Sequence, residues 1–398
     1  MENIEFADRV KDLRGSAIRE SFKALSRPGI ISFAGGMPAP ETYPAAELAR
    51  IADDILTNHA VTALQYGITE GYAPLIAQTE ARLAKAGIAG NRGDSLIITS
   101  GGQQAIELTT KALINEGDGI ACEDPSFVGA LNAFRSYNAR LYPVPMERDG
   151  MDVGALERVL AENQRIKFIY TIPTFQNPSG ITMSLEKRKR LLDVAARYGV
   201  FILEDNPYGE LRFAGEDVPA VKSMDRENRV IYVGSYSKTV SPGLRVGFLL
   251  ARSDLTEKVT VCKQVSDVHS NLMAQMMISA YLDGCDADAR IAASARLNGK
   301  KCALMRDCME EYFPGNITRT APEGGLFLWC DLGGGVDSRE FAAKCLEQNV
   351  AIVSGAAAMP DTSKITSAFR LNFSMASEEN IEKGIKALGE VIKGYGKR

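Results

Sequence analysis

Short runs of apolar residues alternate with helical patterns between residues 46 and 285, and this alternation limits the fold more than any other feature of the chain. In runs such as 169–172 and 200–203 the apolar residues follow one another directly, as in strands that helices cover on both faces. Because parallel strands need helical crossovers, the pattern predicts an α/β fold with a mostly parallel, wound central sheet. The strands are predicted at 95–99, 119–122, 140–144, 167–172, 200–204, 229–234 and 246–251.

Two further segments flank this unit. Residues 1–45 end in a stretch dense in Gly and Pro, which predicts an irregular arm. After residue 285 the pattern changes to a long helical stretch at about 287–313, followed by short strands and helices, which indicates a smaller α+β domain. We therefore expect an arm or lid at 1–45 that packs with the small domain and the active site, a large domain at 46–285 and a small C-terminal domain at 286–398.

Charge and composition exclude several classes of function. Lys and Arg number 46 against 50 Asp and Glu, and no basic stripe is present that would bind nucleic acid. No apolar run approaches the roughly 18 residues that cross a membrane, so no membrane partner is expected. The seven cysteines form no CxxC pair, which is typical of reduced thiols, and we expect a cytoplasmic protein. His59 and His269 are the only histidines and lie near no nucleophile motif, so no metal site is predicted.

Three predicted strands end in polar motifs that carry chemistry. They read YTIPTFQNPSG at 170–180, EDNPYGEL at 204–211 and GSYSKTVSPGLRVG at 234–247. Ligands of wound α/β sheets bind at the carboxyl ends of strands. The motifs combine an amide, a phenol, a carboxylate and an amine flanked by hydroxyls, which is the set that pyridoxal phosphate requires.

A fourth motif, SGGQQA at 100–105, follows a predicted strand and opens a helix. Such a turn aims free backbone N–H groups at an anion. It matches neither the dinucleotide-binding fingerprint nor the Walker loop, and taken alone it is most often only a tight connection.

Together and in this order, these motifs resemble those of the fold-type I, class I/II aminotransferases. The closest resemblance is to the aminoadipate, kynurenine and branched-chain group that includes enzymes of lysine biosynthesis, and it extends to the arm SAIRESFKALSRPGIISFAGGMPAPETYP. It implies pyridoxal 5′-phosphate as the cofactor and a ping-pong transfer of an α-amino group to a 2-oxo acid such as 2-oxoglutarate. The implied donor is acidic, such as glutamate or 2-aminoadipate, or else apolar or aromatic.

The resemblance also assigns catalytic and cofactor-binding roles. Lys238 would bond the cofactor covalently and then move the α-proton, Asp205 would pair with the ring nitrogen, and Asn177 and Tyr208 would contact the ring oxygen. Phe127 would stack on the ring, where many relatives have a tyrosine whose hydroxyl is lost here. The residues implied to hold the phosphate are Gly101, Gly102, Gln103, Ser235, Ser237 and Arg245.

Substrate and subunit contacts are implied in the same way. Arg370 would grip the substrate α-carboxylate together with Asn177, and Gly35 and Gly36 would let the backbone approach the substrate. Arg19 would meet the distal carboxylate of acidic substrates, although it could equally face solvent on an exposed helix. Tyr66 would reach the phosphate of a neighbouring subunit, and the segment 266–275 would line the same interface. A homodimer with shared active sites is therefore expected.

Two alternatives to transamination follow from the same residues. These cofactor-binding residues activate the α-carbon but do not determine which of its bonds breaks. A lyase or decarboxylase on the same fold is therefore an alternative function. A regulator that senses pyridoxal phosphate would carry an N-terminal DNA-binding domain, and this sequence begins directly at the arm.

Overall fold

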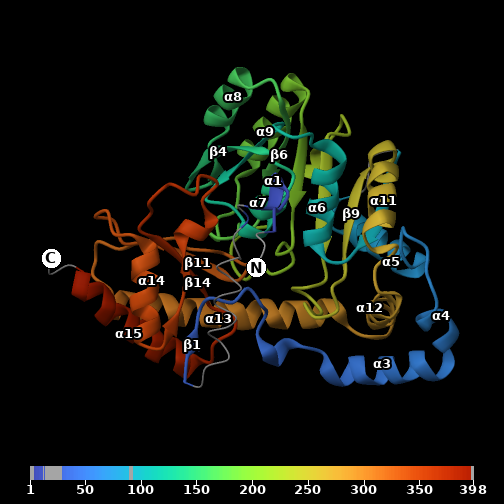
Figure 1. Cartoon of the computed structure of the whole chain (residues 1–398). Coiled ribbons are helices and arrows are strands. Elements are labelled where there is room, and N and C mark those ends of the chain that lie inside the picture. The colour runs from blue at the N-terminus through green and yellow to red at the C-terminus, as the bar shows by residue number, and fades with distance from the viewer. Residues whose placement is uncertain (1–3, 12, 14–28, 89–92, 396–398) are drawn as a thin grey trace.

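The computed structural model describes residues 4–11, 13, 29–88 and 93–395. Its centre is a sheet of eight strands (Figure 1). In spatial order these are β2 (Asp94–Thr99), β9 (Gly247–Arg252), β8 (Val230–Ser235), β7 (Phe201–Asp205), β6 (Ile166–Thr171), β3 (Gly119–Asp124), β4 (Arg140–Glu147) and β5 (Gly150–Met151). The neighbours from β8 to β4 pair in parallel, whereas β9 runs antiparallel to both β2 and β8. The prediction of a mostly parallel sheet is confirmed.

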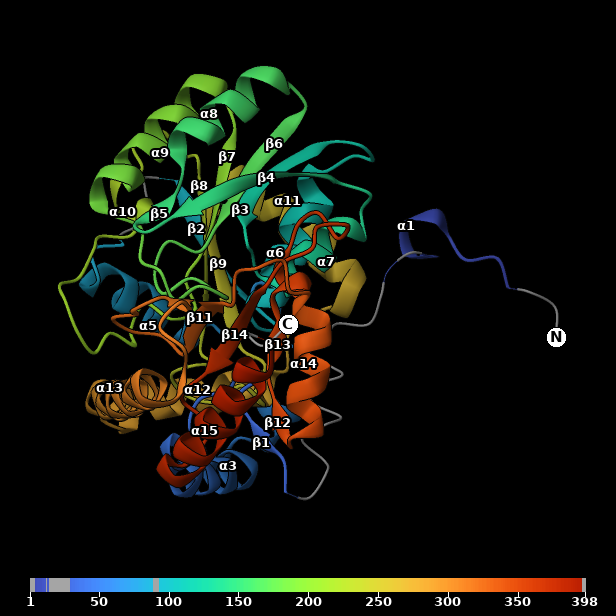
Figure 2. The ribbon, with the colours of Figure 1, turned by 90° about the vertical axis from the view of Figure 1, so that its left-hand side faces the viewer.

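Helices cover both faces of this sheet. The consecutive residues Phe168, Ile169 and Tyr170 of β6 are all fully buried, but Ile169 belongs to a different core cluster from its two neighbours. Successive side chains of a strand point to opposite faces, so each face needs its own cover. One face packs on α6 (Gly102–Leu113), α7 (Val128–Arg135) and α11 (Ser253–Asp267). Figure 2 shows the strands between these helices and those of the other face.

The other face carries two groups of helices. They are α8 (Val153–Glu162), α9 (Leu185–Tyr198) and α10 (Val221–Met224), and then α3 (Ala45–Asn58), α4 (Ala60–Leu64), α5 (Ala73–Lys85) and α12 (Leu272–Gly284).

All seven predicted strands occur, with ends that differ by up to three residues. The largest difference is in β4, which continues through Pro145 to Glu147. Proline cannot donate to a strand ladder and is tolerated where pairing is incomplete. Beyond β4 lies only the two-residue strand β5, which pairs with Met146 and Glu147, so the prolines 143 and 145 cost few hydrogen bonds.

A second, four-stranded sheet follows the large one in sequence. It has the order β10 (Thr318–Arg319), β11 (Phe327–Asp331), β14 (Ala368–Asn372) and β13 (Val353–Ser354), with a short 3-10 helix, η2 (Gly355–Ala358), after β13. The helices α13 (Ala287–Tyr312), α14 (Ser338–Glu347) and α15 (Glu378–Tyr395) pack on it. Ala287 and Ile291 join core clusters of the large sheet, whereas Met305 and Met309 join that of the small sheet. The single helix α13 thus spans both units, and 286–398 stays a proposal for the small domain.

The N-terminal segment joins the small sheet's side of the molecule. After α1 (Asp8–Lys11), the next described element is β1 (Ile31–Ser32), which pairs in parallel with β12 (Val350–Ala351). The short 3-10 helix η1 (Pro40–Thr42) then leads into α3. Phe33 is fully buried in the core cluster between the small sheet and its helices. No helix in the described ranges is long and apolar enough to cross a membrane.

A buried ion cluster closes the amino-terminal edge of the large sheet. Lys222 Nζ lies 2.8 Å from Asp94 Oδ2 and 3.3 Å from Asp225 Oδ2, and it donates to the Val230 carbonyl at 2.9 Å. All three ionised side chains are almost fully buried. Because the charges sit away from water, each depends on the others for compensation.

We expect Lys222→Ala to destabilise the protein by about 3–5 kcal/mol, because two buried carboxylates would lose their cation. Urea unfolding followed by circular dichroism measures the change, and Lys189→Ala, on the exposed face of α9, serves as the control. Equal midpoints for the two variants would contradict a stabilising role for the cluster.

Candidate active site

The polar motifs that end β6, β7 and β8 meet at one cavity of about 550 Å³. Met37, Ile106 and Ile172 add apolar surface to it. Twelve residues predicted from the sequence line it, and they come from the arm, the large sheet and the small sheet: Gly36, Gly102, Gln103, Phe127, Asn177, Asp205, Tyr208, Ser235, Ser237, Lys238, Arg245 and Arg370.

Lys238 lies in the loop after β8, and its amine faces this cavity. The Nζ atom donates a hydrogen bond to the Gly36 carbonyl at 2.7 Å. Burial, together with the positive charges of Arg245 and Arg370, lowers the pKa of Lys238 from 10.5 to about 8. A substantial fraction of the amine is therefore uncharged near neutral pH, as a nucleophile or base requires.

Asp205 is the last residue of β7 and is only 4% exposed. Its Oδ2 atom accepts a hydrogen bond of 2.8 Å from the Tyr170 hydroxyl. Burial raises the pKa of Asp205 to about 7, against the opposing effects of Tyr170 and Lys238.

Asn177 links the centre of the cavity to Arg370. Its Nδ2 atom donates to the Tyr208 hydroxyl at 3.4 Å, and its Oδ1 accepts from Arg370 Nη1 at 2.9 Å. Burial raises the pKa of Tyr208, so its hydroxyl keeps its proton at ordinary pH. The amide thus orients a phenol on one side and a guanidinium on the other.

Arg370 projects from β14 into the same cavity. Its Nη2 atom donates to the carbonyls of Ala34 and Gly35 at 2.7 and 3.2 Å, and the guanidinium lies 4.2 Å from the centre of the Phe327 ring. Burial lowers the pKa of Arg370 to about 10, so it stays charged. Its buried Nε has no hydrogen-bond partner among the described residues, and a carboxylate is the ligand that a free guanidinium donor prefers.

The turn before α6 forms the end of the cavity with free backbone donors. Gly101 has φ +80°, and a Cβ there would lie 2.4 Å from Arg245 Nη2, so the turn requires glycine. Arg245 donates to the Ser237 hydroxyl at 3.3 Å and to the Ser100 carbonyl at 3.2 Å. The start of a twelve-residue helix next to an arginine and serine hydroxyls suits a phosphate.

Comparisons with known proteins identify the family. A family model described as aminotransferase class I and II matches residues 32–388. The chain is 39% identical to aromatic-amino-acid aminotransferase 1 of Thermococcus litoralis, over 98% of this chain and 94% of that protein. It is 38% identical to the 2-aminoadipate transaminase of Thermus thermophilus, over 96% and 95%. The chain belongs to the class I and II aminotransferases.

Solved structures agree with this assignment. The aminotransferase superposes on the kynurenine aminotransferase of Pyrococcus horikoshii, solved with PMP and kynurenine, with a TM-score of 0.93, 36% identity and coverage of 98% of this chain and 97% of that one. It is therefore a fold-type I enzyme that uses pyridoxal 5′-phosphate and acts on amino acids. The predictions of family, fold class, reaction and cofactor are confirmed.

The cavity of the aminotransferase fits this cofactor. A buried amine, a buried carboxylate and a phosphate-sized turn of backbone N–H groups all face one space. The amine suits the aldehyde of the cofactor and the carboxylate suits its ring nitrogen. The backbone N–H groups at the helix start suit its phosphate.

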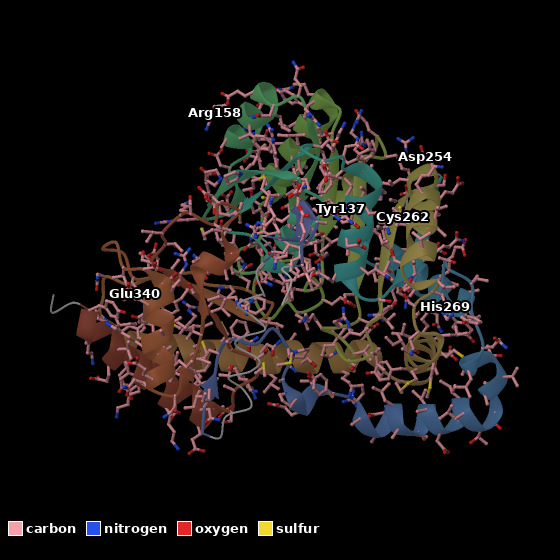
Figure 3. All side chains as sticks on the ribbon, in the orientation of Figure 1. Tyr137, Arg158, Asp254, Cys262, His269 and Glu340 are labelled. Atoms are coloured by element: carbon pink, nitrogen blue, oxygen red, sulfur yellow. The ribbon has the colours of Figure 1, made fainter. Side chains whose placement is uncertain are left out.

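One residue predicted for the site lies away from the cavity in the single chain. Tyr66 does not line the cavity and is 80% exposed in the single chain, with its ring edge-on to His269 at 5.9 Å between centroids. Figure 3 shows His269 at the side of the molecule that α11 and α12 form. Arg19 falls outside the described residues. Gly101 lies next to the cavity, behind Arg245.

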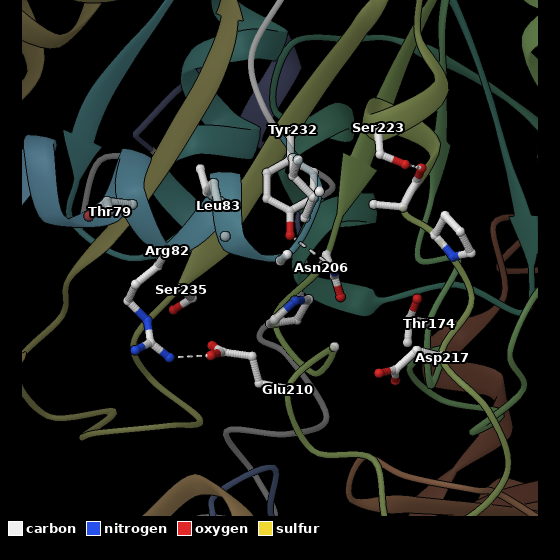
Figure 4. A pocket seen from close by; sticks show the side chains of 18 of the residues that line it. Thr79, Arg82, Leu83, Thr174, Asn206, Glu210, Asp217, Ser223, Tyr232 and Ser235 are labelled. Atoms are coloured by element: carbon white, nitrogen blue, oxygen red, sulfur yellow. Dashed lines mark hydrogen bonds and ion pairs between the residues drawn. The ribbon is translucent and has the colours of Figure 1, made fainter. Parts of the chain in front are cut away.

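A second cavity, of about 470 Å³, is lined by residues of α5 and of the loop that follows β7, among them Arg82, Asn206 and Glu210 (Figure 4). It shares Pro207 and Ser235 with the first cavity. Arg82, on its wall, pairs with Glu210 and Asp288. Among the described residues it has no lysine on its lining, so the first cavity is the candidate active site.

Sequence reasoning missed a buried polar layer beneath the site. Tyr170 contacts Asp205, and Glu123, at the end of β3, accepts hydrogen bonds from Thr171 and Gln176 at 2.5 and 3.0 Å. The signal was a tyrosine and a glutamate inside otherwise apolar runs, because buried polar groups need partners. Their partners lie 35 to 53 residues away in sequence.

We expect the rate at which the cofactor-free protein captures pyridoxal 5′-phosphate to rise with pH through about 8, because we propose that the Lys238 amine attacks the aldehyde, which only an uncharged amine can do. Arg370→Gln removes a neighbouring positive charge and should move this midpoint to higher pH, whereas the exposed Arg339→Gln should not. Stopped-flow absorbance measures the rate. A midpoint near 10.5 in the unaltered protein would contradict the effect of burial on Lys238.

Proposed function

We propose that the aminotransferase moves the amino group of an amino acid to a 2-oxo acid at Lys238, with 2-oxoglutarate or glutamate as one partner. The observation that carries this proposal is the buried amine of Lys238, which shares one cavity with Asp205 and Arg370. When bound, pyridoxal 5′-phosphate supplies an electron sink for the substrate α-carbon.

Lys238 has two tasks in this proposal. Its Nζ atom would hold the cofactor through its aldehyde carbon, with release of water, and once the substrate amine has replaced it there, the freed Nζ atom would be placed to accept the α-proton and to give it back. The lowered pKa of Lys238, about 8, supports both tasks, because the amine must lose and gain a proton near neutral pH.

The other cavity groups hold the cofactor. Asp205 would accept a hydrogen bond from the ring nitrogen and keep that nitrogen protonated, Asn177 and Tyr208 would hold the ring oxygen, and Phe127 would cover the face of the ring. The phosphate is held by the remaining residues, which are Gly101, Gly102, Gln103, Ser235, Ser237 and Arg245.

Arg370 binds the α-carboxylate, which its unpaired Nε supports, and Gly36 leaves room for the substrate beside it. The apolar side chains of Met37, Ile106 and Ile172 on the cavity wall favour apolar or aromatic donors. Arg19 remains the proposed partner of a distal carboxylate. The similar proteins named above act on aromatic amino acids, 2-aminoadipate and kynurenine, and this spread supports both classes of donor.

A homodimer completes the proposal. Exposed apolar side chains lie on α4 and the loop after it and at the end of α11, and the Tyr66 ring in that loop lies edge-on to His269 just beyond α11. They are Val61, Leu64, Tyr66, Ile68, Val265 and Val268. An apolar patch of this kind marks a contact surface. Tyr66 lies in it, in keeping with a role in the partner's site. The seven free cysteines, five of them buried, favour a reducing compartment, and we propose the cytoplasm.

Lys238→Ala should abolish transamination and leave the fold unchanged, because it removes both the bonding amine and the base. Borohydride reduction of the loaded enzyme, followed by peptide mapping, should place the cofactor on Lys238. A donor and acceptor screen with identification of the 2-oxo product tests the reaction. Labelling of another lysine, or release of carbon dioxide in place of a 2-oxo acid, would overturn the proposal.

Val265→Glu should weaken the dimer, because it places a charge within the apolar patch on α11, and cofactor retention should fall with it. Ile365→Glu is the matched control, since Ile365 is equally apolar and 64% exposed but lies on the small domain. Analytical ultracentrifugation measures the assembly. A Val265→Glu protein that stays as dimeric as the control would contradict the proposed interface.

A further inference from the structure

Tyr170 is a buried tyrosine whose hydroxyl points at the candidate active site. Its ring is fully buried and packs edge-on against Phe134, at 5.3 Å between centroids. The hydroxyl donates to Asp205 Oδ2 at 2.8 Å. The rest of the side chain belongs to the apolar cluster on the face of the sheet that α6 and α7 cover. Tyr170 therefore brings one polar atom through an apolar layer to one carboxylate oxygen.

Sheet register explains this contact. Tyr170 of β6 pairs with Leu203 of β7, and Leu203 and Asp205 lie on the same face because they are two residues apart. Tyr170 and Asp205 are thus diagonal neighbours on adjacent strands, at a separation that a long aromatic side chain bridges. Both strands are in the middle of the sheet, which leaves the pair little freedom to move.

The Tyr170 hydroxyl is the one side-chain hydrogen-bond donor to Asp205 that the described residues provide. Burial opposes the charge on Asp205, and Lys238 supports it from across the cavity. The titratable or charged groups that face this carboxylate are Tyr170 on β6, Glu123 on β3, Tyr232 on β8, and Tyr208 and Lys238 in loops. Of these, only Tyr170 touches Asp205 as a neutral donor.

We propose that Tyr170 is a positioning residue of this aminotransferase, whose hydroxyl fixes Asp205 in place and keeps it charged for the ring nitrogen of the cofactor. The inference rests on the role proposed above for Asp205. Tyr170 suits this task because burial raises its pKa well above 10, so the hydroxyl keeps its proton and donates at every working pH.

The sign of the pH effect follows from the contact. Tyr170→Phe leaves the buried Oδ2 atom of Asp205 without its donor, and an unpaired buried carboxylate has a raised pKa. The pKa of Asp205 is already about 7, so a further rise moves the loss of its charge to higher pH. Cofactor affinity should therefore fall off at a higher pH in the variant than in the unaltered protein.

The experiment compares Tyr170→Phe with Tyr281→Phe, which removes a hydroxyl from a tyrosine that is also almost fully buried but lies in another core cluster. Fluorescence titration of the cofactor-free proteins with pyridoxal 5′-phosphate, from about pH 6 to 9, measures the dissociation constant. Tyr170→Phe should bind roughly 10- to 100-fold more weakly, as for a lost hydrogen bond to a charged group. The acidic limb of its profile should shift upward. The control should change neither quantity.

Asp205→Asn and the double variant separate this inference from the proposed function. If Asp205→Asn binds the cofactor normally, the role of Asp205 itself is wrong. If Asp205→Asn weakens binding but Tyr170→Phe matches the control, the tyrosine inference is wrong. When both single variants weaken binding, adding Tyr170→Phe to Asp205→Asn should weaken binding little further, because the charge that Tyr170 supports has already gone. Full additivity would overturn the inference.

Two side chains introduced by codon suppression separate the loss of the hydrogen bond from a defect in packing or folding. 4-Fluorophenylalanine at position 170 fills the space of the hydroxyl without donating, and 4-aminophenylalanine restores a donor on the same ring. The fluoro variant should behave as Tyr170→Phe does, and the amino variant should recover affinity and the position of the acidic limb. Equal affinity for the two would show that packing and not hydrogen bonding matters at position 170.

Discussion

The guanidinium of Arg370 joins three parts of the chain, and the active-site cavity depends on that contact. Arg370 stands on β14 of the small sheet, donates to Asn177 in a loop of the large sheet, and donates to the backbone of Ala34 and Gly35 in the arm. A buried cation is costly unless its donors are satisfied. The arm and both sheets must therefore come together for the charge to be tolerated, and the same approach closes the cavity around Lys238.

Burial lowers the pKa of Lys238 and raises the pKa of Asp205, and the neighbouring residues differ accordingly. For Lys238, burial favours the uncharged amine, and the nearby cations Arg245 and Arg370 add to that effect. For Asp205, burial favours the uncharged acid, whereas the proposed role requires the charged carboxylate. This asymmetry accounts for the surroundings, because a lysine needs only cationic neighbours to become a base, whereas a carboxylate in the same space needs a donor such as Tyr170.

The sequence predicts the parts of the site that follow from local pattern. Consecutive apolar residues mark the covered strands, and polar residues at strand ends then identify Lys238, Asp205 and Asn177, because parallel strands bring their carboxyl ends to one edge. It does not predict which buried polar groups meet, since Tyr170 reaches Asp205 only through the register of β6 and β7. The surface position of Tyr66 also depends on packing, of α4 against α12, and no local pattern reveals it.

The layer beneath the site links these observations. Glu123 accepts from Thr171, Ile172 and Gln176, and Gln176 in turn accepts from the Ser179 backbone. One buried carboxylate thus holds the start of the loop that carries Asn177 and the residue that precedes Asn177. Burial raises the pKa of Glu123 to about 7, and the charge of Asp205 adds to this rise. The loop that contacts Arg370 and the carboxylate of Asp205, which we propose to face the ring nitrogen, therefore share one electrostatic environment, so a loss of charge at Asp205 would lower the pKa of Glu123.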